Sequence, residues 1–318
     1  MTVLEAIQKS TEFLAKKGVD SPRLQTELLL AHLLKLPRMK LYLNFGRTLT
    51  SAETDTLREF VKRRGQREPL QYIIGSTSFC GFEIAVNRHA LVPRPETELL
   101  AELGWEFLNQ NLHGRADLPV GQEVQQRVPT SVLDFGSGTG CIAIALAVKC
   151  PSAKIVATDI SPDALELAKQ NAERNKVADR IEFVQGDGFA ALQTVRQASR
   201  LSPSEKKKSE TGGTPVLHFD LIISNPPYIP SAEIATLQPE VRDFDPRGAL
   251  DGGADGLDFY RKLAVEAKPF LKPDGKIMLE FGDGQADAIR TIFETEKWIV
   301  EAVKADYSQR PRILVAKI

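Results

Sequence analysis

The chain has 318 residues, of which 42% are hydrophobic and 26% are charged, and its formal net charge is -1. This composition is typical of a globular protein with one large domain or two domains, and the missing basic excess argues against binding nucleic acid by phosphate neutralisation. The three cysteines match no zinc or disulfide spacing and the four histidines form no HExxH motif, so we expect reduced thiols, a cytoplasmic location and no metal site. The sequence has no apolar stretch near the length of about 18 residues that spans a membrane, and its first residues lack the pattern of a signal peptide.

Residues 1–73 are predicted to form an N-terminal helical domain. The stretch "VLEAIQKSTEFLAKKG" has apolar residues close to a helical period. A second helix is expected to begin with Ser21 as its N-cap and Pro22 at its first position. A third is expected to begin at Thr50 and Glu53, which have the spacing of a capping box.

Four basic residues, Lys62, Arg63, Arg64 and Arg67, follow one another at the end of this third helix. We favour the interpretation that they face the negative end of the helix dipole. The alternative is a binding patch.

Residues 74–95 are predicted to form a β-hairpin linker, because short β-rich runs are separated there by glycines. At the end of the linker, Pro93 and Pro95 force extended backbone around Arg94. Glu96 follows and leads into an apolar helix. This segment is either a proline-rich helix entry or a means of fixing Arg94 for a substrate.

From residue 96 to residue 318 strand-like and helix-like stretches alternate. "SVLDFG", "KIVATDI", "RIEFVQGD", "FDLIISN", "GKIMLEFG" and "RILVAKI" read as strands, mostly with helical stretches between them. This alternation predicts an α/β domain with a mostly parallel sheet covered on both faces, which binds ligands at the carboxyl ends of its strands. Two stretches, at about 113–130 and 196–216, look like insertions.

Glycines 136, 138 and 140 in "LDFGSGTGC" lie at the turn from a strand to a helix. The position that would complete a dinucleotide fingerprint is Cys141, and no Gly-Lys-Ser/Thr follows, so dinucleotide and P-loop sites are both excluded. Asp134 adds a carboxylate that a diphosphate would disfavour and an ammonium group would favour. Asp159 ends the next strand, the usual place for an acid on ribose hydroxyls, and Asp187 ends the third strand, where it suits an adenine amino group.

An ammonium group, a ribose and an adenine without phosphate together describe S-adenosylmethionine. We therefore predict a binding site for this cofactor at successive strand ends. Its expected residues are Asp134, Gly136, Ser137, Gly138, Thr139, Gly140, Asp159, Asp187, Gly188, Phe189 and Asn225.

The segment "NPPY", Asn225 to Tyr228, comes directly after the apolar run "FDLIIS". It is a good turn sequence, and it also suits methyl transfer to a planar NH2 group. The nitrogen lone pair of an amide is delocalised, and full loss of this conjugation costs on the order of 18–20 kcal/mol. The Asn225 side-chain oxygen and the Pro226 carbonyl can each accept one N–H, while Pro227 stiffens the turn and Tyr228 packs on the substrate. We predict these four residues as the catalytic and substrate-binding set, with Arg94 and Glu96 beside the substrate.

The chain resembles the release-factor glutamine methyltransferases over nearly its full length. The resemblance rests on "TELLLAHLLKLPRMKLYLNF", "REPLQYIIG", "LVPRPETELL", "LDFGSGTG", "DLIISNPPYIP" and "PEVRDFDPRGALDGGADGLDFYRKL". It implies a class I S-adenosylmethionine-dependent methyltransferase fold, Rossmann-like with a mostly parallel seven-stranded sheet, behind a small helical domain that docks the substrate. It also implies transfer to the N5 atom of the glutamine in the Gly-Gly-Gln motif of peptide chain release factors. The protein is expected to act as a monomer.

Two departures and two alternatives accompany this resemblance. Members often carry an aromatic residue directly after the acid of the third strand, whereas Gly188 stands here and Phe189 follows. The insertions also lie outside the family pattern. A DNA or RNA adenine-N6 methyltransferase would use the same amine geometry, and a binding module without activity could keep the cofactor fold. The neutral-to-acidic charge, the absence of an obvious base-reading domain and the helical domain argue against the first, and the intact "NPPY" argues against the second.

Overall fold

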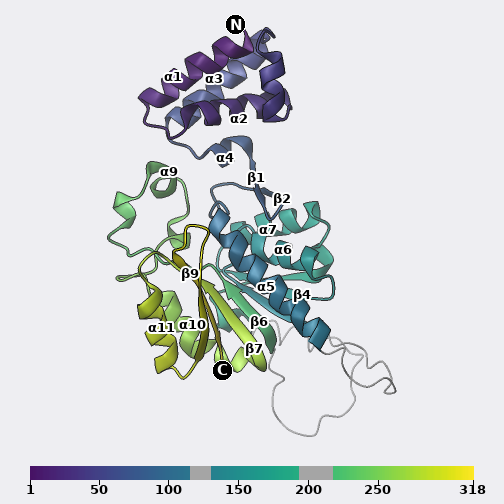
Figure 1. Ribbon diagram of the computed structural model, residues 1–318, viewed down its shortest axis with the longest axis vertical. Helices are drawn as coiled ribbons and strands as arrows, with labels where there is room; N and C mark the ends of the chain where they lie inside the picture. The colour runs from purple at the N-terminus through teal and green to yellow at the C-terminus, as the bar shows by residue number, and fades with distance from the viewer. Residues whose placement is uncertain (115–129, 193–217) are drawn as a thin grey trace. The chain divides into compact units, whose positions relative to one another are not determined.

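The computed structural model describes residues 1–114, 130–192 and 218–318, which form two compact units (Figure 1). The first unit comprises Met1–Thr77, Val86–Arg88 and Thr236–Asp245, and the second comprises Ser78–Ala85, His89–Ala235 and Pro246–Ile318. The predicted insertions lie outside the described residues, except at the edges of the first. In the described ranges, no helix combines the length and the apolar character needed to cross a membrane.

The first unit is helical, as the sequence predicts. Its elements up to residue 74 are α1 (Val3–Lys16), α2 (Pro22–Leu34), the 3-10 helix η1 (Arg38–Asn44), α3 (Ser51–Gly65) and α4 (Leu70–Ile74). Their apolar faces share one buried core. The capping box of α3 is confirmed, because Thr50 and Glu53 bond to each other's backbone amides. Ser21 is the N-cap residue of α2 and Pro22 its first residue, as expected, but Ser21 is left-handed, with φ of 45°, and its hydroxyl makes no capping bond.

The basic run at the end of α3 is used inside the first unit. Arg64 is buried, and its Nη2 donates to Glu240 Oε1 at 2.6 Å, while Arg67 Nη2 donates to Glu240 Oε2 at 2.6 Å. Glu240 lies on the short helix α9 (Pro239–Arg242), which the sequence analysis placed in the C-terminal domain. The two arginines therefore hold a distant segment of the chain, a role that neither sequence interpretation anticipated.

The predicted hairpin is present as β1 (Ser76–Phe79) and β2 (Phe82–Ala85), which form a two-stranded sheet. Cys80 and Gly81 make the turn, both with positive φ.

The second unit is built on one seven-stranded sheet in the order β5-β4-β3-β6-β7-β9-β8. The strands are β3 (Ser131–Phe135), β4 (Lys154–Asp159), β5 (Ile181–Gln185), β6 (Phe219–Ser224), β7 (Leu271–Glu280), β8 (Ile299–Ala305) and β9 (Pro311–Lys317). Only β9 runs against its neighbours, so the prediction of a mostly parallel sheet is confirmed. Strand β8 and helix α11 were not predicted.

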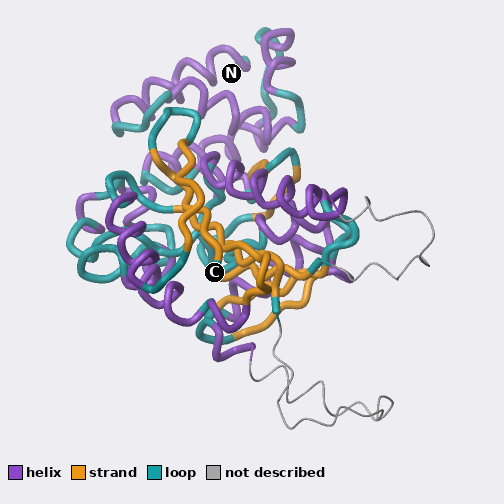
Figure 2. Tube along the Cα trace, turned by 60° about the horizontal axis from the view of Figure 1, so that its bottom comes forward, coloured by secondary structure: helices purple, strands orange, loops and turns teal. Residues whose placement is uncertain are grey.

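Helices cover both faces of this sheet. They are α5 (Pro95–Gly114), α6 (Cys141–Lys149), α7 (Pro162–Arg174), α10 (Asp258–Glu266) and α11 (Ala286–Thr295). Helix α6 packs between α5 and α7, and α10 packs beside α11 on the other side of the strands (Figure 1). Figure 2 shows the strands, in orange, running between helices. Five short helical turns, η2 (Ala178–Arg180), η3 (Ile234–Thr236), α9, η4 (Arg247–Ala249) and η5 (Lys268–Phe270), lie in the connections.

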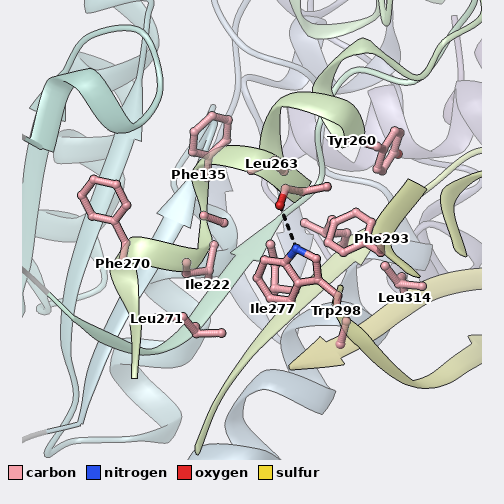
Figure 3. Close-up of a cluster of buried hydrophobic side chains, with 14 of the residues drawn as sticks. Phe135, Ile222, Tyr260, Leu263, Phe270, Leu271, Ile277, Phe293, Trp298 and Leu314 are labelled. Carbon is pink, nitrogen blue, oxygen red and sulfur yellow. Dashed lines mark hydrogen bonds between the residues drawn. The ribbon is translucent and has the colours of Figure 1, made fainter. Parts of the chain in front are cut away.

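The main core lies between the sheet and helices α10 and α11 (Figure 3). Trp298 is buried there, and its indole Nε1 donates to the Ala264 carbonyl oxygen at 2.8 Å, the dashed contact in Figure 3. Tyr260 is fully buried, and its hydroxyl donates to the Glu280 carbonyl oxygen at 2.7 Å. This bond fixes the carboxyl end of β7, next to the end of β6.

Candidate functional site

A cavity of about 270 Å³ opens at the carboxyl ends of β3, β4, β5 and β6. In the sheet order, β4 lies on one side of β3 and β6 on the other, so the chain changes direction across the sheet at this point. Ligands of open α/β sheets bind at such a switch point. The cavity volume is close to the lower end of the usual range for small-molecule sites, about 300–1,000 Å³.

The glycine loop follows β3 and forms one wall of this cavity. Gly136 and Gly138 have positive φ, at 71° and 54°, a conformation that strains other residues. A Cβ at Gly136 would meet no atom within 4 Å, so this glycine leaves open space. Gly140 is different, because a Cβ there would meet the Ala168 side chain at 3.0 Å. The first two glycines thus shape the cavity, and the third lets α6 approach α7.

The loop also presents polar groups to the cavity. Ser137 and Thr139 line it, and the Ser137 Oγ is buried without a hydrogen-bond partner among the described residues. A buried hydroxyl without a partner is unfavourable, and a ligand atom would satisfy it.

Asp159 ends β4 and faces the same cavity. Its Oδ2 accepts from the Gly138 amide at 2.8 Å, and its Oδ1 accepts from the Ser161 amide at 2.9 Å. Each carboxylate oxygen can accept a further bond, so Asp159 can still bind two hydroxyl groups. The same Ser161 caps α7 through its side chain, as predicted.

Asp134 lies beneath the glycine loop and is fully buried. Its Oδ2 accepts from the Ala143 amide at 3.1 Å, and its Oδ1 has no hydrogen-bond partner among the described residues. Burial raises the pKa of this carboxyl to about 7. Asp134 is not among the residues that line the cavity, so the structure places it one layer behind the position that the sequence analysis expected.

Of the three residues after β5 that were predicted to bind the cofactor, Asp187 and Gly188 line the cavity and Phe189 does not. Gly188 lines the cavity with Asp187, whose carboxylate accepts from Lys262 Nζ at 2.6 Å. Phe189 is buried in the core instead, stacked on Phe270 with ring centroids 4.9 Å apart. Asp187 also lies beyond β5, which ends at Gln185.

Asn225, Pro226 and Pro227 form another wall of the cavity, and the loop that precedes α10 holds the turn from Asn225 to Tyr228 in place. Ile229 pairs with Asp251, and the Gly252 amide donates to the Ile229 carbonyl at 2.9 Å. The Tyr228 carbonyl accepts from Gln285 Nε2 at 2.9 Å. The backbone that follows the turn is therefore bonded on two sides.

Asn225 lines the cavity, and its side chain has a defined orientation. Its Nδ2 donates to Thr97 Oγ1 at 3.0 Å. This contact uses the amide nitrogen and leaves the amide oxygen Oδ1 as the end available to a ligand. Pro226 and Pro227 line the cavity beside it.

Tyr228 lies apart from the other three residues. Its ring packs against the main core, and it is not among the residues that line the cavity. Burial, and then the nearby Glu280 carboxyl, raise the pKa of the Tyr228 phenol to about 12. The predicted packing of this ring on a substrate stays a prediction.

Arg94 and Glu96, at the start of α5, have different surroundings. Arg94 lines the cavity, whereas Glu96 is exposed and does not. Two further residues that the sequence analysis did not single out lie next to Asn225. Thr97 is buried on α5, and Glu280 is buried at the end of β7 with a pKa that burial raises to about 7, although a hydrogen bond from the Thr97 hydroxyl lowers it.

The pairing of β6 with β7 explains why Glu280 is close to Asn225. Ser224 pairs with Leu279 in the parallel ladder, so Asn225 and Glu280 are the next residues along the two neighbouring strands. The signal for Glu280 was a single acid at the end of the apolar run "IML".

Comparison with known families matches both units of the chain. Residues 5–75 match the PrmC N-terminal domain, and residues 127–313 match a methyltransferase domain. The chain has the class I S-adenosylmethionine-dependent methyltransferase fold that the resemblance implies.

Three curated relatives carry the same description, release factor glutamine methyltransferase. The protein of Geobacter sulfurreducens is 41% identical over 292 residues, which cover 92% of this chain and 88% of the relative. That of Chlorobaculum tepidum is 38% identical over 98% of this chain and 95% of its own length. That of Rhodospirillum rubrum is 38% identical over 94% of this chain and 80% of its own length. By these matches, the chain belongs to the release factor glutamine methyltransferase family.

Proposed function

We propose that this protein transfers a methyl group from S-adenosyl-L-methionine to the N5 atom of the glutamine in the Gly-Gly-Gln motif of peptide chain release factors. One observation carries the proposal: a cavity with a glycine loop on one wall has, on the other, an asparagine whose amide nitrogen is already bonded to Thr97. The names of the relatives support the substrate class.

The residues of the cavity fit this cofactor. The glycines with positive φ leave room for a ligand against the backbone, and the unpartnered Ser137 Oγ can bond to a polar group. Asp159 has acceptor capacity for two ribose hydroxyls, and Asp187 and Gly188 lie where an adenine would reach. When bound, S-adenosylmethionine supplies an electrophilic methyl group on a sulfonium centre.

The turn from Asn225 supplies the groups that act on the substrate. With its nitrogen on Thr97, Asn225 can accept one N–H of the glutamine amide at Oδ1, and the Pro226 carbonyl can accept the other. Accepting both aligns the substrate nitrogen with the cavity and places two dipoles where positive charge develops. The proline backbone keeps those dipoles in position before the substrate binds.

The test is methyl transfer from labelled S-adenosylmethionine to four acceptors: a purified release factor, its Gln→Asn variant in the Gly-Gly-Gln motif, double-stranded DNA and single-stranded RNA. We expect label only on the unmodified release factor, and mass spectrometry should locate it on the motif glutamine. Label on the nucleic acids, or equal label on the Asn variant, would contradict the proposal and favour an adenine or a less specific amine acceptor.

A further inference from the structure

The orientation of the Asn225 side chain depends on more than its own contact. The Thr97 hydroxyl accepts from Asn225 Nδ2 at 3.0 Å. The Glu280 carboxyl lies beside Asn225 through the pairing of β6 with β7, and the Thr97 hydroxyl is the group that can donate a proton to it. Thr97 is 3% exposed and Glu280 is 1% exposed, so water cannot easily replace either partner. Thr97 on α5 therefore links Glu280, at the end of β7, to Asn225, which follows β6.

A hydroxyl group has one proton, and this limits the arrangement. An ionised carboxylate can only accept, so Thr97 must donate its proton to Glu280. The hydroxyl oxygen can then only accept from Asn225, which requires the NH2 end of the amide and not the oxygen. An ionised Glu280 therefore fixes which end of the Asn225 amide faces the substrate.

We propose that Thr97 and Glu280 are positioning residues that hold the Asn225 side-chain oxygen toward the substrate nitrogen. The proposal rests on the proposed function, in which that oxygen accepts an N–H. It assigns a role to a buried acid that the reaction itself does not use. Neither residue contacts the substrate; both act through Asn225.

Protonation of Glu280 should release this constraint. A protonated carboxyl can donate to the Thr97 oxygen, which frees the hydroxyl proton to bond to the amide oxygen of a turned Asn225. The turned amide would present its NH2 group to the NH2 group of the substrate, and two donors repel. Activity should therefore be high when Glu280 is ionised and low when it is protonated.

The surroundings of Glu280 place this change near neutral pH. Burial raises its pKa to about 7 against the lowering effects of Thr97, Arg312 and Arg94, and Glu96 adds to the rise. Arg312 is itself bonded to Asp306 and to the Phe281 carbonyl. Two phenols complete the neighbours that titrate: Tyr228 of the turn and Tyr260 of α10, whose pKa values both lie above the ordinary range. Both phenols stay neutral at pH 7.

Kinetics with saturating cofactor test the role of Thr97. Thr97→Val keeps the shape but removes the hydroxyl, and kcat should fall about tenfold or more while KM for the release factor changes less than threefold. Thr97→Ser keeps the hydroxyl and should restore kcat to within about threefold. Thr291→Val, on α11, is the matched control for loss of a helix hydroxyl that bonds to backbone, and its kcat should match the wild type.

The pH profile tests the role of Glu280. In the wild type, kcat should rise with an inflection near pH 7. Gln can donate or accept, so Glu280→Gln should lower kcat at pH 8.5 severalfold and remove that inflection. Glu301→Gln, which changes a half-buried acid paired with Lys276 and Lys317 on the same sheet, should keep the inflection.

A measurement without substrate separates this proposal from the proposed function. The side-chain amide of Asn225, observed by NMR in protein labelled at asparagine nitrogen and assigned by its loss in Asn225→Ala, should shift with pH around 7. The shift should vanish in Glu280→Gln and persist in Asp134→Asn, which removes the buried acid beneath the glycine loop.

Each failure has a distinct result. A wild type that labels no release factor contradicts the proposed function, and the Asn225 signal still decides the positioning role. An Asn225 signal that does not change between pH 5.5 and pH 9, or one that changes equally in Glu280→Gln, overturns the positioning role. So does a Thr97→Val variant with wild-type kcat.

Discussion

The two walls of the cavity each have one buried acid behind them, and the two acids are held differently. Asp134, behind the glycine loop, accepts from a backbone amide, and its other oxygen has no partner among the described residues. Glu280, behind the turn at Asn225, accepts from the Thr97 hydroxyl in the arrangement that we propose, and its Oε2 has no partner among the described residues. Burial raises both pKa values to about 7.

The difference between the two acids lies in what their partners can do. A backbone N–H only donates, so the Ala143 amide keeps one bond whatever the charge of Asp134. A hydroxyl can either donate or accept, so the protonation state of Glu280 determines which end of the Asn225 amide can bond to Thr97. We call the glycine loop and Asp159 the cofactor wall and the turn at Asn225 the chemical wall, after the roles that we propose for them. The cofactor wall is held by backbone hydrogen bonds, whereas in our proposal the chemical wall is held by side chains whose protonation can change.

Removal of the Asn225 side chain should have the largest effect and should fall on the chemical wall alone. Loss of one aligned acceptor of this type lowers kcat by about 10²–10³-fold. The affinity for S-adenosylmethionine should change less than about threefold, because the glycine loop and Asp159 are untouched. Single-turnover rates and calorimetric titration of Asn225→Ala measure the two quantities. An equal loss of both would mean that the two walls are not independent.

Asp134→Asn should change how stability depends on pH. The native pKa of about 7 lies above the ordinary value of 3.8, so the folded state binds more protons, and the free energy of unfolding should fall as pH rises from about 4 to about 7. The penalty is absent below that window, complete above it and on the order of 4 kcal/mol. In Asp134→Asn the unfolding free energy should no longer fall by this amount. The smaller fall that remains should come from Glu280, whose pKa is raised in the same direction.

Urea unfolding at pH 5 and pH 8 measures this effect. Asp179→Asn, at an exposed position in η2, is the control and should follow the wild type at both pH values. A difference between the two pH values that is as large in Asp134→Asn as in the wild type would show that Asp134 is already ionised without penalty in the folded state.

The sequence predicts the cofactor wall more fully than the chemical wall, for a physical reason. Glycines at a strand-to-helix turn and Asp159 at the next strand end belong to local patterns, each readable within a few residues. Asn225 was readable in the same way, from its place before two prolines. Thr97 and Glu280 were not, because they meet Asn225 only when β6 and β7 become neighbours and α5 packs on them.

Local patterns also explain where the structure differs from what the sequence analysis expected. Phe189 follows the predicted adenine-binding residues in the sequence, but its hydrophobic side chain is buried in the core cluster that contains Phe135 and Phe270. Asp134 was expected to face the ligand because it ends an apolar strand, yet α6 begins close enough for Ala143 to bond to it. Strand β8 was missed because none of its residues is fully buried and its sequence, "IVEAVKA", carries two charges.

Gly256→Ala should disturb the chemical wall through its backbone. A Cβ at Gly256 would lie 2.3 Å from the Tyr228 carbonyl oxygen and 2.7 Å from Gln285 Nε2, the two atoms that bond to each other behind the turn. We expect the variant to lose about 3 kcal/mol of unfolding free energy, and about tenfold in kcat because the turn must shift.

Gly284→Ala is the matched control for this variant. Gly284 has the same φ of +78°, and a Cβ there meets nothing within 4 Å. Gly284→Ala should lose only the roughly 1–2 kcal/mol of unfolding free energy that a left-handed conformation costs a residue with a Cβ, and its kcat should not change. Equal losses of stability in the two variants would show that backbone conformation, and not the contact with Tyr228, governs the turn.

Asp159→Ala should have the smallest effect of the four, and it should fall on the cofactor wall. The Asp159 carboxylate accepts from the Gly138 and Ser161 amides, and the variant loses both bonds. The glycine loop keeps its backbone hydrogen bonds to the Thr158 carbonyl. Loss of charge-assisted bonds to a ligand is worth about 1.5–3 kcal/mol, and solvent at this open strand end should keep the effect near the lower limit, so the Kd for S-adenosylmethionine should rise about tenfold. At saturating cofactor kcat should stay within about threefold of the wild type, since Asn225, Thr97 and Glu280 are unchanged. A fall in kcat larger than the rise in Kd would mean that the acid on the cofactor wall also aligns the methyl group with the turn, and the two walls would then act as one.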